Sequence, residues 1–409
     1  MKRLRLLVVS SDTYPPTRVD VSVLFGAELA KRGHQIDWIL QSEAACPHPY
    51  VAEWGGGRVW VGATDLGSSL IRRLHKHALG MLNDCRLFFL LRRSQYDAVQ
   101  VKDKFLAGIL ALLASRLFHT RLIYWLSFPF PEYYLLRAHD GTARYPRLYV
   151  WRGLIFQWLL YRWLLPAADH VFVQSEQMRE DIAAKGIPLE KMTAVPMGVQ
   201  VDMFPAAEMP LARRVLPAGA PCVLYLGTLD KVRRLDFLIR VFALVRAAIP
   251  AARLYIVGRG EDPRDEAFLQ GEVERLGLQP CVTFVGQLPQ SQALRYVQEA
   301  DVCVSPFYPT AVLRSTSPTK LVEYMAMGKA VVANDHPEQR RVIEASGAGY
   351  CVPYEEQAFA AAVVSLLEDP ETARVMGQRG RRYAVEHRGY GVIADSVEKQ
   401  LLAVALGEK

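Results

Sequence analysis

Short apolar runs alternate with longer segments of helical periodicity along the whole chain. Such runs predict buried strands, and residues 21–29 and 235–249 have the spacing of helices with one buried face. Two series of runs predict two doubly wound α/β domains with parallel sheets, in which a ligand cleft lies outside the carboxyl ends of the strands. The predicted strands are residues 4–10, 35–40, 97–101, 121–126 and 170–175 in the first half, and 221–227, 252–258, 281–286, 301–306, 330–334 and 349–353 in the second.

One predicted helix carries two charges in an apolar setting. Ser317 is its predicted N-cap and Gly328 its end. Glu323, one turn into the helix, can accept two ribose hydroxyls while the helix start holds phosphate oxygens. The alternative is an ion pair three residues apart with Lys320 on a surface turn. The positions expected to face the core are Leu321, Val322, Met325 and Ala326.

The composition places the chain among globular proteins. It has 409 residues, 51% of them hydrophobic, enough for two or three domains. No apolar run approaches the about 20 residues of a membrane span, and the N-terminus predicts a first buried strand and not a signal peptide. The net charge of +7 suits anionic small molecules, membrane surfaces or nucleic acid. No nucleic-acid-binding motif accompanies that charge.

The six cysteines lack disulfide and metal patterns. They form no CxxC pair and have no zinc spacing with histidine. This pattern indicates a reducing compartment and predicts no metal site.

Two loops in the second half have the composition of a phosphate site. Lys231, Arg233 and Arg234 cluster where a loop leaves a strand and enters a helix, which suits a diphosphate. The alternative for this cluster is a solvated basic face. Gly258 and Gly260 follow the next strand and allow close approach of backbone to a ligand, although a plain turn explains them equally well.

These segments resemble the retaining glycosyltransferases of family 4, also called glycosyl transferases group 1, in order and approximate spacing. The resemblance covers nearly the whole chain and is strongest from residue 170 to 340. It implies the GT-B fold, in which two Rossmann-like domains face each other across a cleft. The domains would be residues 1–205 on the acceptor side and 206–385 for the nucleotide-sugar donor, with a linker within 196–221. The C-terminal helix, 386–409, would return to the first domain. The matching segments are 175–204, 225–239, 253–263, 282–307 and 320–335.

The resemblance also implies roles for single residues. Glu323 matches the second glutamate of the family's ExxxxxxxE motif and would hold the donor ribose. Arg233 matches the phosphate-binding lysine, with Lys231 assisting. Gly258 and Gly260 would lie beside the nucleotide, and the stretch ending at Leu288 would contact its base. The implied donor site as a whole is Thr228, Lys231, Arg233, Gly258, Gly260, Leu288, Lys320, Leu321, Val322 and Glu323.

The chain departs from the family at several positions. Ser315 replaces the first glutamate of ExxxxxxxE, and Thr228 stands where the family has an arginine. The loop after Pro15 and Pro16 lacks the family's glycine pair. Ser127 occupies the position of a histidine, and Asp103 matches an acidic position that faces the cleft. The implied catalytic residues are therefore Asp103, Ser127 and Ser315.

The mechanism implied is front-face transfer with retention. Arg233, Lys231 and a helix N-terminus would stabilise the leaving diphosphate, and the leaving phosphate could take the acceptor's proton. No metal and no cofactor beyond the nucleotide-diphosphate sugar is expected.

Two basic stretches bear on the acceptor. Residues 144–170 mix Trp151, Trp158 and Trp163 with arginine and leucine, a composition typical of a membrane interface. Residues 69–95 are basic and amphipathic. The alternative is that both are helices packed on the sheet with outward-pointing arginines.

The sequence therefore predicts a bacterial hexosyltransferase of class EC 2.4. It would move a sugar from a nucleotide-sugar donor to a lipid-linked acceptor in cell-surface polysaccharide or glycolipid synthesis. The expected location is the cytoplasm, peripheral to the inner face of the membrane. A nucleotide-sugar epimerase of the same fold stays open, as does a binding protein of an assembly complex with weakened catalysis, which Ser315 and Ser127 favour.

Overall fold

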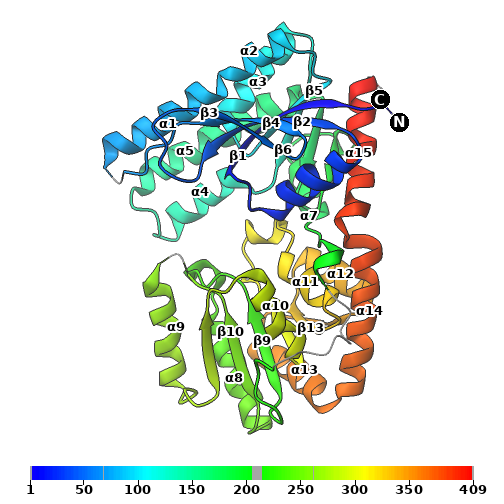
Figure 1. Ribbon diagram of the computed structural model, residues 1–409. Coiled ribbons are helices and arrows are strands. Elements are labelled where there is room, and N and C mark those ends of the chain that lie inside the picture. The colour runs from blue at the N-terminus through cyan, green and yellow to red at the C-terminus, as the bar shows by residue number, and fades with distance from the viewer. Residues whose placement is uncertain (1, 68, 205–213, 261, 408–409) are drawn as a thin grey trace. The chain divides into compact units, whose positions relative to one another are not determined.

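The computed structural model describes residues 2–67, 69–204, 214–260 and 262–407, and the chain forms two compact units (Figure 1). The N-terminal unit consists of Met1–Pro196 and Tyr390–Lys409, and the C-terminal unit of Met197–Gly389. The domain boundary predicted after residue 205 lies outside the described residues.

The N-terminal unit is built on an eight-stranded sheet of order β3-β4-β2-β1-β5-β6-β7-β8. Every neighbouring pair is parallel except β3 and β4. The five predicted strands are confirmed; the hairpin β3–β4 and the edge strand β8 were not predicted. The strands are β1 Arg5–Tyr14, β2 Gln35–Ser42, β3 Tyr50–Trp54, β4 Gly57–Gly62, β5 Ala98–Lys102, β6 Arg121–Leu126, β7 His170–Val173 and β8 Met192–Ala194.

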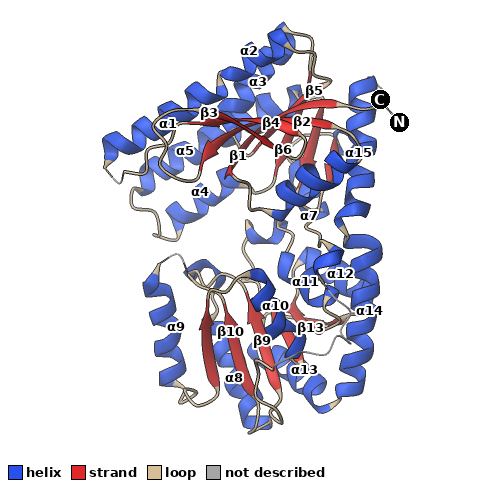
Figure 2. Ribbon diagram, in the orientation of Figure 1, coloured by secondary structure: helices blue, strands red, loops and turns tan. Residues whose placement is uncertain are grey.

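Helices cover both faces of this sheet (Figure 2). One face packs a core against α2, α3, η2 and α7, and the other packs a core against η1 and α15. His34 and Arg32, which follow η1, bind Glu398 of α15 at 2.9 and 2.6 Å. The helical segments are η1 Asp20–Leu29, α1 Leu70–Asp84, α2 Arg86–Arg93, α3 Phe105–Leu117, α4 Phe130–His139, α5 Pro146–Leu159, η2 Leu160–Leu164, α6 Leu165–Ala167, α7 Glu176–Ala183, η3 Leu189–Lys191 and α15 Tyr390–Leu406.

The C-terminal unit has a six-stranded, wholly parallel sheet of order β11-β10-β9-β12-β13-β14. All six predicted strands are confirmed. The strands are β9 Cys222–Leu226, β10 Arg253–Val257, β11 Val282–Gly286, β12 Val302–Ser305, β13 Ala330–Asn334 and β14 Gly349–Val352. The helical segments are η4 Val201–Met203, η5 Lys231–Arg233, α8 Asp236–Ala248, α9 Pro263–Arg275, α10 Gln290–Glu299, η6 Leu313–Ser315, α11 Thr319–Ala326, α12 Pro337–Ser346, α13 Glu356–Glu368 and α14 Pro370–Arg388.

The strand orders place two crevices. In the C-terminal sheet, β10 and β11 lie on one side of β9, and the chain then continues with β12 on the other side of β9. In the N-terminal sheet, β1 and β5 are the corresponding neighbouring strands. Ligands of doubly wound sheets bind at the carboxyl ends of such strands. The functional residues are therefore sought after β9 and β12, and after β1 and β5.

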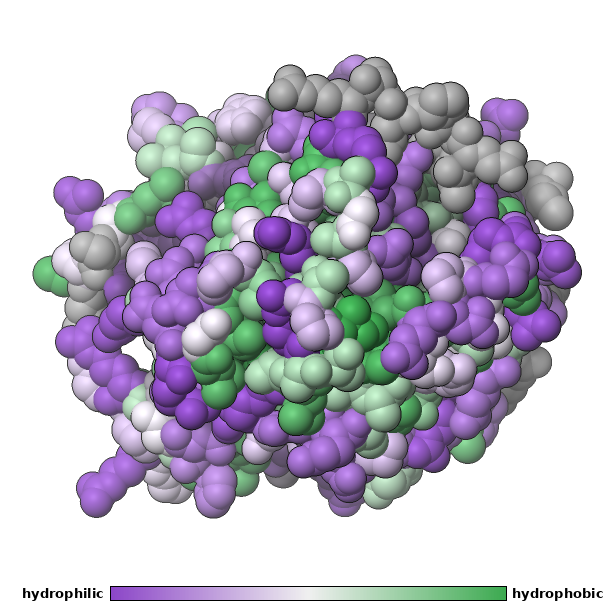
Figure 3. Space-filling view, turned by 90° about the horizontal axis from the view of Figure 1, so that it is seen from below, coloured by the Kyte–Doolittle hydropathy of each residue, from purple (hydrophilic) through white to green (hydrophobic). Residues whose placement is uncertain are grey.

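The outer surface mixes hydrophilic and hydrophobic side chains. In the view from below, hydrophobic residues gather towards the middle of the face and hydrophilic residues surround them (Figure 3). No described helix has the length and apolar character needed to cross a bilayer.

Candidate active site

A pocket of about 530 Å³ opens at the carboxyl ends of β9, β10 and β11 in the C-terminal unit. Four of the residues predicted to bind the donor line it, namely Thr228, Gly258, Gly260 and Leu288. The complete lining is Leu226, Gly227, Thr228, Val257, Gly258, Arg259, Gly260, Gln287, Leu288 and Ala293. Glycine backbone and aliphatic side chains thus form a shallow, partly apolar floor.

Gly258 is required by the packing of this floor. Its φ is +140°, and a Cβ built on it would lie 1.9 Å from the carbonyl oxygen of Gly227. Its amide also donates a 2.9 Å hydrogen bond to the carbonyl of Gly286. The loops after β9, β10 and β11 therefore pack backbone to backbone, which leaves the pocket open to a flat ligand.

Lys320 lies in the first turn of α11, behind the loop that follows β9. Its Nζ donates a 2.7 Å hydrogen bond to the Tyr225 hydroxyl and lies 3.9 Å from the centroid of that ring. Burial lowers the pKa of Lys320 well below its usual value, and the nearby Arg233 lowers it further, although Glu323 opposes both effects. An anionic group at this position would stabilise the charged lysine.

Arg233 ends the turn η5, just before α8. Its guanidinium lies 5.3 Å from the centroid of Phe307, and Lys320 Nζ lies at the same distance from the same ring. Arg233 Nε is buried and has no hydrogen-bond partner among the described residues. Lys231 is exposed on the same turn. Two cations thus lie next to one aromatic ring at the carboxyl end of β12, as a diphosphate requires.

Glu323 is half-buried on α11 and accepts a 3.3 Å hydrogen bond from Gln290 Nε2. Burial raises the pKa of Glu323, although Gln290 and Lys320 oppose the shift. Because Lys320 bonds Tyr225 and Glu323 bonds Gln290, each charge has a partner other than its neighbour on the helix. The side chains of Leu321 and Val322 lie in the core, so only their backbone amides can meet a ligand.

The helix start differs from the sequence prediction. α11 begins at Thr319 with Pro318 as its N-cap, and Ser317 instead accepts a 3.0 Å hydrogen bond from the amide of Met197. Ser315 is buried in η6. Its neighbour Arg314 lines a separate pocket of about 280 Å³ together with His336.

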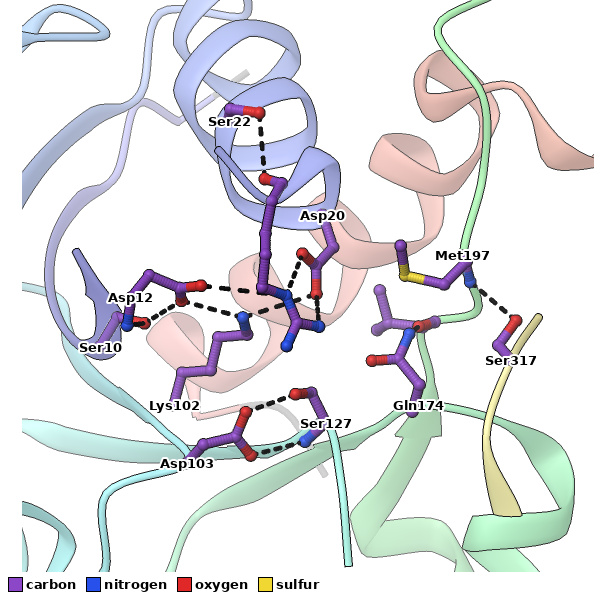
Figure 4. Close-up of polar contacts among 12 residues, drawn as sticks. Ser10, Asp12, Asp20, Ser22, Lys102, Asp103, Ser127, Gln174, Met197 and Ser317 are labelled. Atoms are coloured by element: carbon purple, nitrogen blue, oxygen red, sulfur yellow. Dashed lines mark hydrogen bonds and ion pairs between the residues drawn. The ribbon is translucent and has the colours of Figure 1, made fainter. Parts of the chain in front are cut away.

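In the N-terminal unit, Asp103 and Ser127 form a buried pair at the carboxyl ends of β5 and β6 (Figure 4). The Ser127 amide donates a 2.8 Å hydrogen bond to Asp103 Oδ1, and the Ser127 hydroxyl donates to Oδ2. Asp103 has a φ of +56°, an uncommon conformation for a residue other than glycine. Burial raises the pKa of Asp103, although Lys102, Ser127 and Arg18 oppose the shift.

A buried ion network beside this pair was not predicted from the sequence. Lys102 Nζ lies 3.0 Å from Asp12 Oδ2 and 3.5 Å from Asp20 Oδ2, and Arg18 binds both oxygens of Asp20 at 2.7 and 3.1 Å. Figure 4 shows Asp12, Asp20 and Lys102 converging above Asp103 and Ser127. Burial alone would raise the pKa of Asp20, but Lys102 and Arg18 hold it below its usual value. The signal in the sequence is the set of charges Asp12, Arg18 and Asp20 on either side of the prolines at 15 and 16.

The structure therefore divides the predicted residues between two places. Asp103 and Ser127 meet in the N-terminal unit, and the remaining eleven lie in the C-terminal unit, where four of them line the pocket. Tyr225 and Phe307, the rings that position the cations, were missed. Among the described residues no group of three or more histidine, cysteine, aspartate or glutamate side chains is arranged to hold a metal ion.

Comparison with sequence families gives two consecutive matches. Residues 23–198 match the Glycosyl transferase 4-like domain, and residues 220–369 match Glycosyl transferases group 1. A phosphatidyl-myo-inositol mannosyltransferase of Mycolicibacterium smegmatis is 32% identical over 179 residues, which are 43% of this chain and 43% of that protein. The match thus spans less than half the length of that relative.

Two solved structures resemble nearly the whole chain. Sucrose-phosphate synthase from Thermosynechococcus elongatus has a TM-score of 0.73 at 23% identity, over 98% of this chain and 100% of the other. The Anabaena protein Alr3699/HepE, solved with UDP and glucose, has a TM-score of 0.68 at 15% identity, over 98% and 100%. These similarities confirm the predicted GT-B fold class.

Proposed function

The chain belongs to the glycosyl transferases of group 1, and on this premise we propose that it is a retaining hexosyltransferase. It moves a sugar from a nucleotide-diphosphate donor to a lipid-linked acceptor in the synthesis of a cell-surface polysaccharide or glycolipid. The observation that carries the proposal is the convergence of Lys320 and Arg233 on the Phe307 ring, close to the pocket at the ends of β9 to β11.

The donor is assigned to the C-terminal unit. The base lies on the floor near Leu288, and Glu323 accepts the ribose hydroxyls. Arg233, Lys231, Lys320 and the first-turn amides of α11 bind the diphosphate. The same Anabaena protein has also been solved with UDP-glucose, which supports a nucleotide-sugar donor, and the pKa shifts of Lys320 and Glu323 support the site.

In the reaction, the bond between the anomeric carbon and the diphosphate oxygen breaks, and a bond to the acceptor oxygen forms on the same face. The acceptor's proton passes to the leaving phosphate oxygen. The cations that bind the diphosphate stabilise the charge that develops on it, since they are already in place before reaction. The proposal assigns no step to a metal or a further cofactor.

The acceptor side is assigned to the N-terminal unit. Asp103 and Ser127 form its polar centre, and the ion network of Asp12, Arg18, Asp20 and Lys102 fixes the loop after β1 next to them. A relative that acts on a phosphatidyl-inositol supports a lipid-linked acceptor. We place the reaction in the cytoplasm, at the inner face of the membrane.

The test is turnover of nucleotide sugars in the presence of a bacterial lipid extract, read as release of nucleoside diphosphate and as labelled lipid. Extract-dependent release supports the proposal. A second candidate, a nucleotide-sugar-binding protein of an assembly complex, is favoured by Ser315 and Ser127 at the two altered positions. Tight nucleotide binding without turnover would select that candidate and contradict the transferase.

A further inference from the structure

Exposed apolar side chains are concentrated in one part of the N-terminal unit. Among the described residues, most of the large apolar side chains that face solvent lie between residues 66 and 163, and the majority of these are on α1, α3, α5 and η2. Contiguous apolar surface marks a site of interaction, whereas isolated exposed side chains need no explanation.

The outer face of α5 and η2, here called the α5 surface, is the most aromatic part. Trp151 is 67% exposed, and Trp158 and Trp163 are each 57% exposed, with the last two rings 5.9 Å apart. The inner side of the same helix is also apolar, because Phe156 stacks on Phe105 of α3 at 4.7 Å. The inner side of α5 thus packs against α3, and the apolar side chains on its outer side are not needed to hold the helix on the protein. The α5 surface consists of Leu148, Trp151, Leu154, Ile155, Trp158 and Trp163.

The charged side chains of the segment that carries the α5 surface have one sign. Residues 141–168 contain four arginines and no aspartate or glutamate. All four arginines, Arg144, Arg147, Arg152 and Arg162, are exposed, and the guanidinium of Arg152 also lies 4.3 Å from the centroid of Tyr134. Tryptophan and leucine in a segment whose only charged residues are arginines match the headgroup region of an anionic bilayer.

Helix α3 extends this surface. It runs beside the segment from α5 to α6, since Phe105 stacks on Phe156 of α5 at one end and Arg116 Nη2 donates a 3.0 Å hydrogen bond to the carbonyl of Ala167 in α6 at the other. Its exposed Leu113 and Leu117 add aliphatic area.

We propose that the α5 surface docks on an anionic lipid bilayer. The three tryptophan rings lie at the level of the headgroups, and Arg147 and Arg162 bind lipid phosphates. A second copy of the chain fits less well, because an isologous dimer would set the arginines of residues 141–168 against each other, and that segment contains no carboxylate to pair them. The inference rests on the proposed function for its purpose, since a lipid-linked acceptor brings the enzyme to the membrane. Its physical argument uses the surface residues alone.

The test is co-sedimentation of the full chain with vesicles of phosphatidylglycerol and phosphatidylethanolamine, and with vesicles of phosphatidylcholine. We expect binding to the anionic vesicles, at least tenfold weaker binding to the neutral ones, and a blue shift of tryptophan emission. The variant Trp151→Ser/Trp158→Ser/Trp163→Ser should lose at least tenfold in affinity and the emission shift. Arg147→Glu/Arg162→Glu should lose affinity and most of its salt dependence.

Matched controls come from exposed residues of the C-terminal unit. Phe268→Ser and Arg382→Glu change the same kinds of side chain and should leave vesicle binding unchanged. Equal urea midpoints would show that all variants fold.

Three results would overturn the inference: no binding to anionic vesicles, equal binding to neutral ones, or binding unaffected by the tryptophan variant. A dimer in ultracentrifugation that the same variant dissociates, without vesicle binding, would assign the surface to a second copy instead. Calorimetry with nucleotides on the same preparations separates the two proposals. Nucleotide binding without vesicle binding contradicts only the docking surface, and the reverse contradicts only the proposed function.

Discussion

Lys320 Nζ donates a 2.7 Å hydrogen bond to the hydroxyl of Tyr225 while it lies 3.9 Å from the centroid of the same ring. The lysine is thus held half-buried by one aromatic residue, and burial lowers its pKa well below the usual value. An anionic ligand stabilises the charged form of such a buried lysine more than it stabilises a solvated lysine, because the buried ammonium group has already lost much of its water.

Replacing Lys320 by methionine tests this relationship. Lys320→Met should weaken the binding of a nucleoside diphosphate at least tenfold, since a charge-assisted hydrogen bond contributes about 1.5–3 kcal/mol. The urea midpoint should be equal or higher, because the folded protein no longer desolvates a lysine. Lys329→Met is the matched control, because burial also lowers the pKa of Lys329. Lys329 lies at the amino end of β13, away from the proposed site, and bonds the carbonyl of Ala300. Equal losses in both variants would contradict the role of Lys320.

Gly258 should tolerate no side chain. Gly258→Ala places a Cβ against the Gly227 carbonyl at a φ of +140°, so the free energy of unfolding should fall by on the order of 3 kcal/mol and nucleotide binding should be lost. Gly271→Ala is the control, since this exposed glycine lies within α9 and a Cβ added to it would meet no other atom within 4 Å. It should raise stability by about 0.5–1 kcal/mol. Urea denaturation measures both, and an unchanged midpoint for Gly258→Ala would contradict the packing described.

Asp103 should make stability fall as pH rises. Burial raises the pKa of its carboxyl, so the folded state binds more protons than the unfolded state between the unfolded value of 3.8 and the raised folded value. Asp103→Asn keeps an acceptor for the Ser127 amide and suits a positive φ. The variant should therefore be more stable than the wild type at neutral pH, and this advantage should shrink as pH falls through the window to 3.8. Urea midpoints at a series of pH values measure it; a constant difference would contradict the raised pKa.

Asp20 should behave in the opposite way. Lys102 and Arg18 hold the pKa of Asp20 below 3.8, so its contribution to stability is complete above 3.8 and is lost as pH falls through the folded value. Asp20→Asn leaves Lys102 short of one buried partner and should cost about 3 kcal/mol at neutral pH. The cost should diminish in acid. A cost below about 0.5 kcal/mol at neutral pH would show that the network does not stabilise the unit.

Glu323 should discriminate ribose from deoxyribose. In the proposed site its carboxylate accepts the 2′ and 3′ hydroxyls, so the wild type should bind a nucleoside diphosphate more tightly than the 2′-deoxy form. Glu323→Gln should reduce that preference severalfold, as measured by calorimetry. Gln290→Ala, which removes only the partner of Glu323, should retain most of it. If the wild type shows no preference, Glu323 does not contact the ribose.

The architecture was largely predictable because buried parallel strands are continuous apolar runs. Residues 330–334 became β13, and Leu321, Val322, Met325 and Ala326 all face the core as expected. The hairpin β3–β4 was missed since its strands are short and joined at Gly55 and Gly56, where the apolar pattern breaks.

Residues of the candidate site could be predicted only where they lie in a loop that directly follows a predicted strand. Gly258 follows its strand directly and could be found, whereas the pairing of Lys102 with Asp12 and Asp20 depends on β1 and β5 being neighbours in the sheet. The same holds for Ser317: its helix capping is a local expectation, but its hydrogen bond to Met197 spans 120 residues. Local patterns cannot specify contacts of that range.

The central claim is that the C-terminal unit binds a nucleotide through Glu323 and Arg233. Calorimetric titration of the purified protein with UDP, GDP, ADP and CMP, repeated on Glu323→Ala and Arg233→Ala, tests it most directly. The account predicts selective binding of one nucleotide that is weakened at least tenfold in both variants. Two results would contradict it: folded wild-type protein that binds none of the four nucleotides, or variants that bind the nucleotide as tightly as the wild type does.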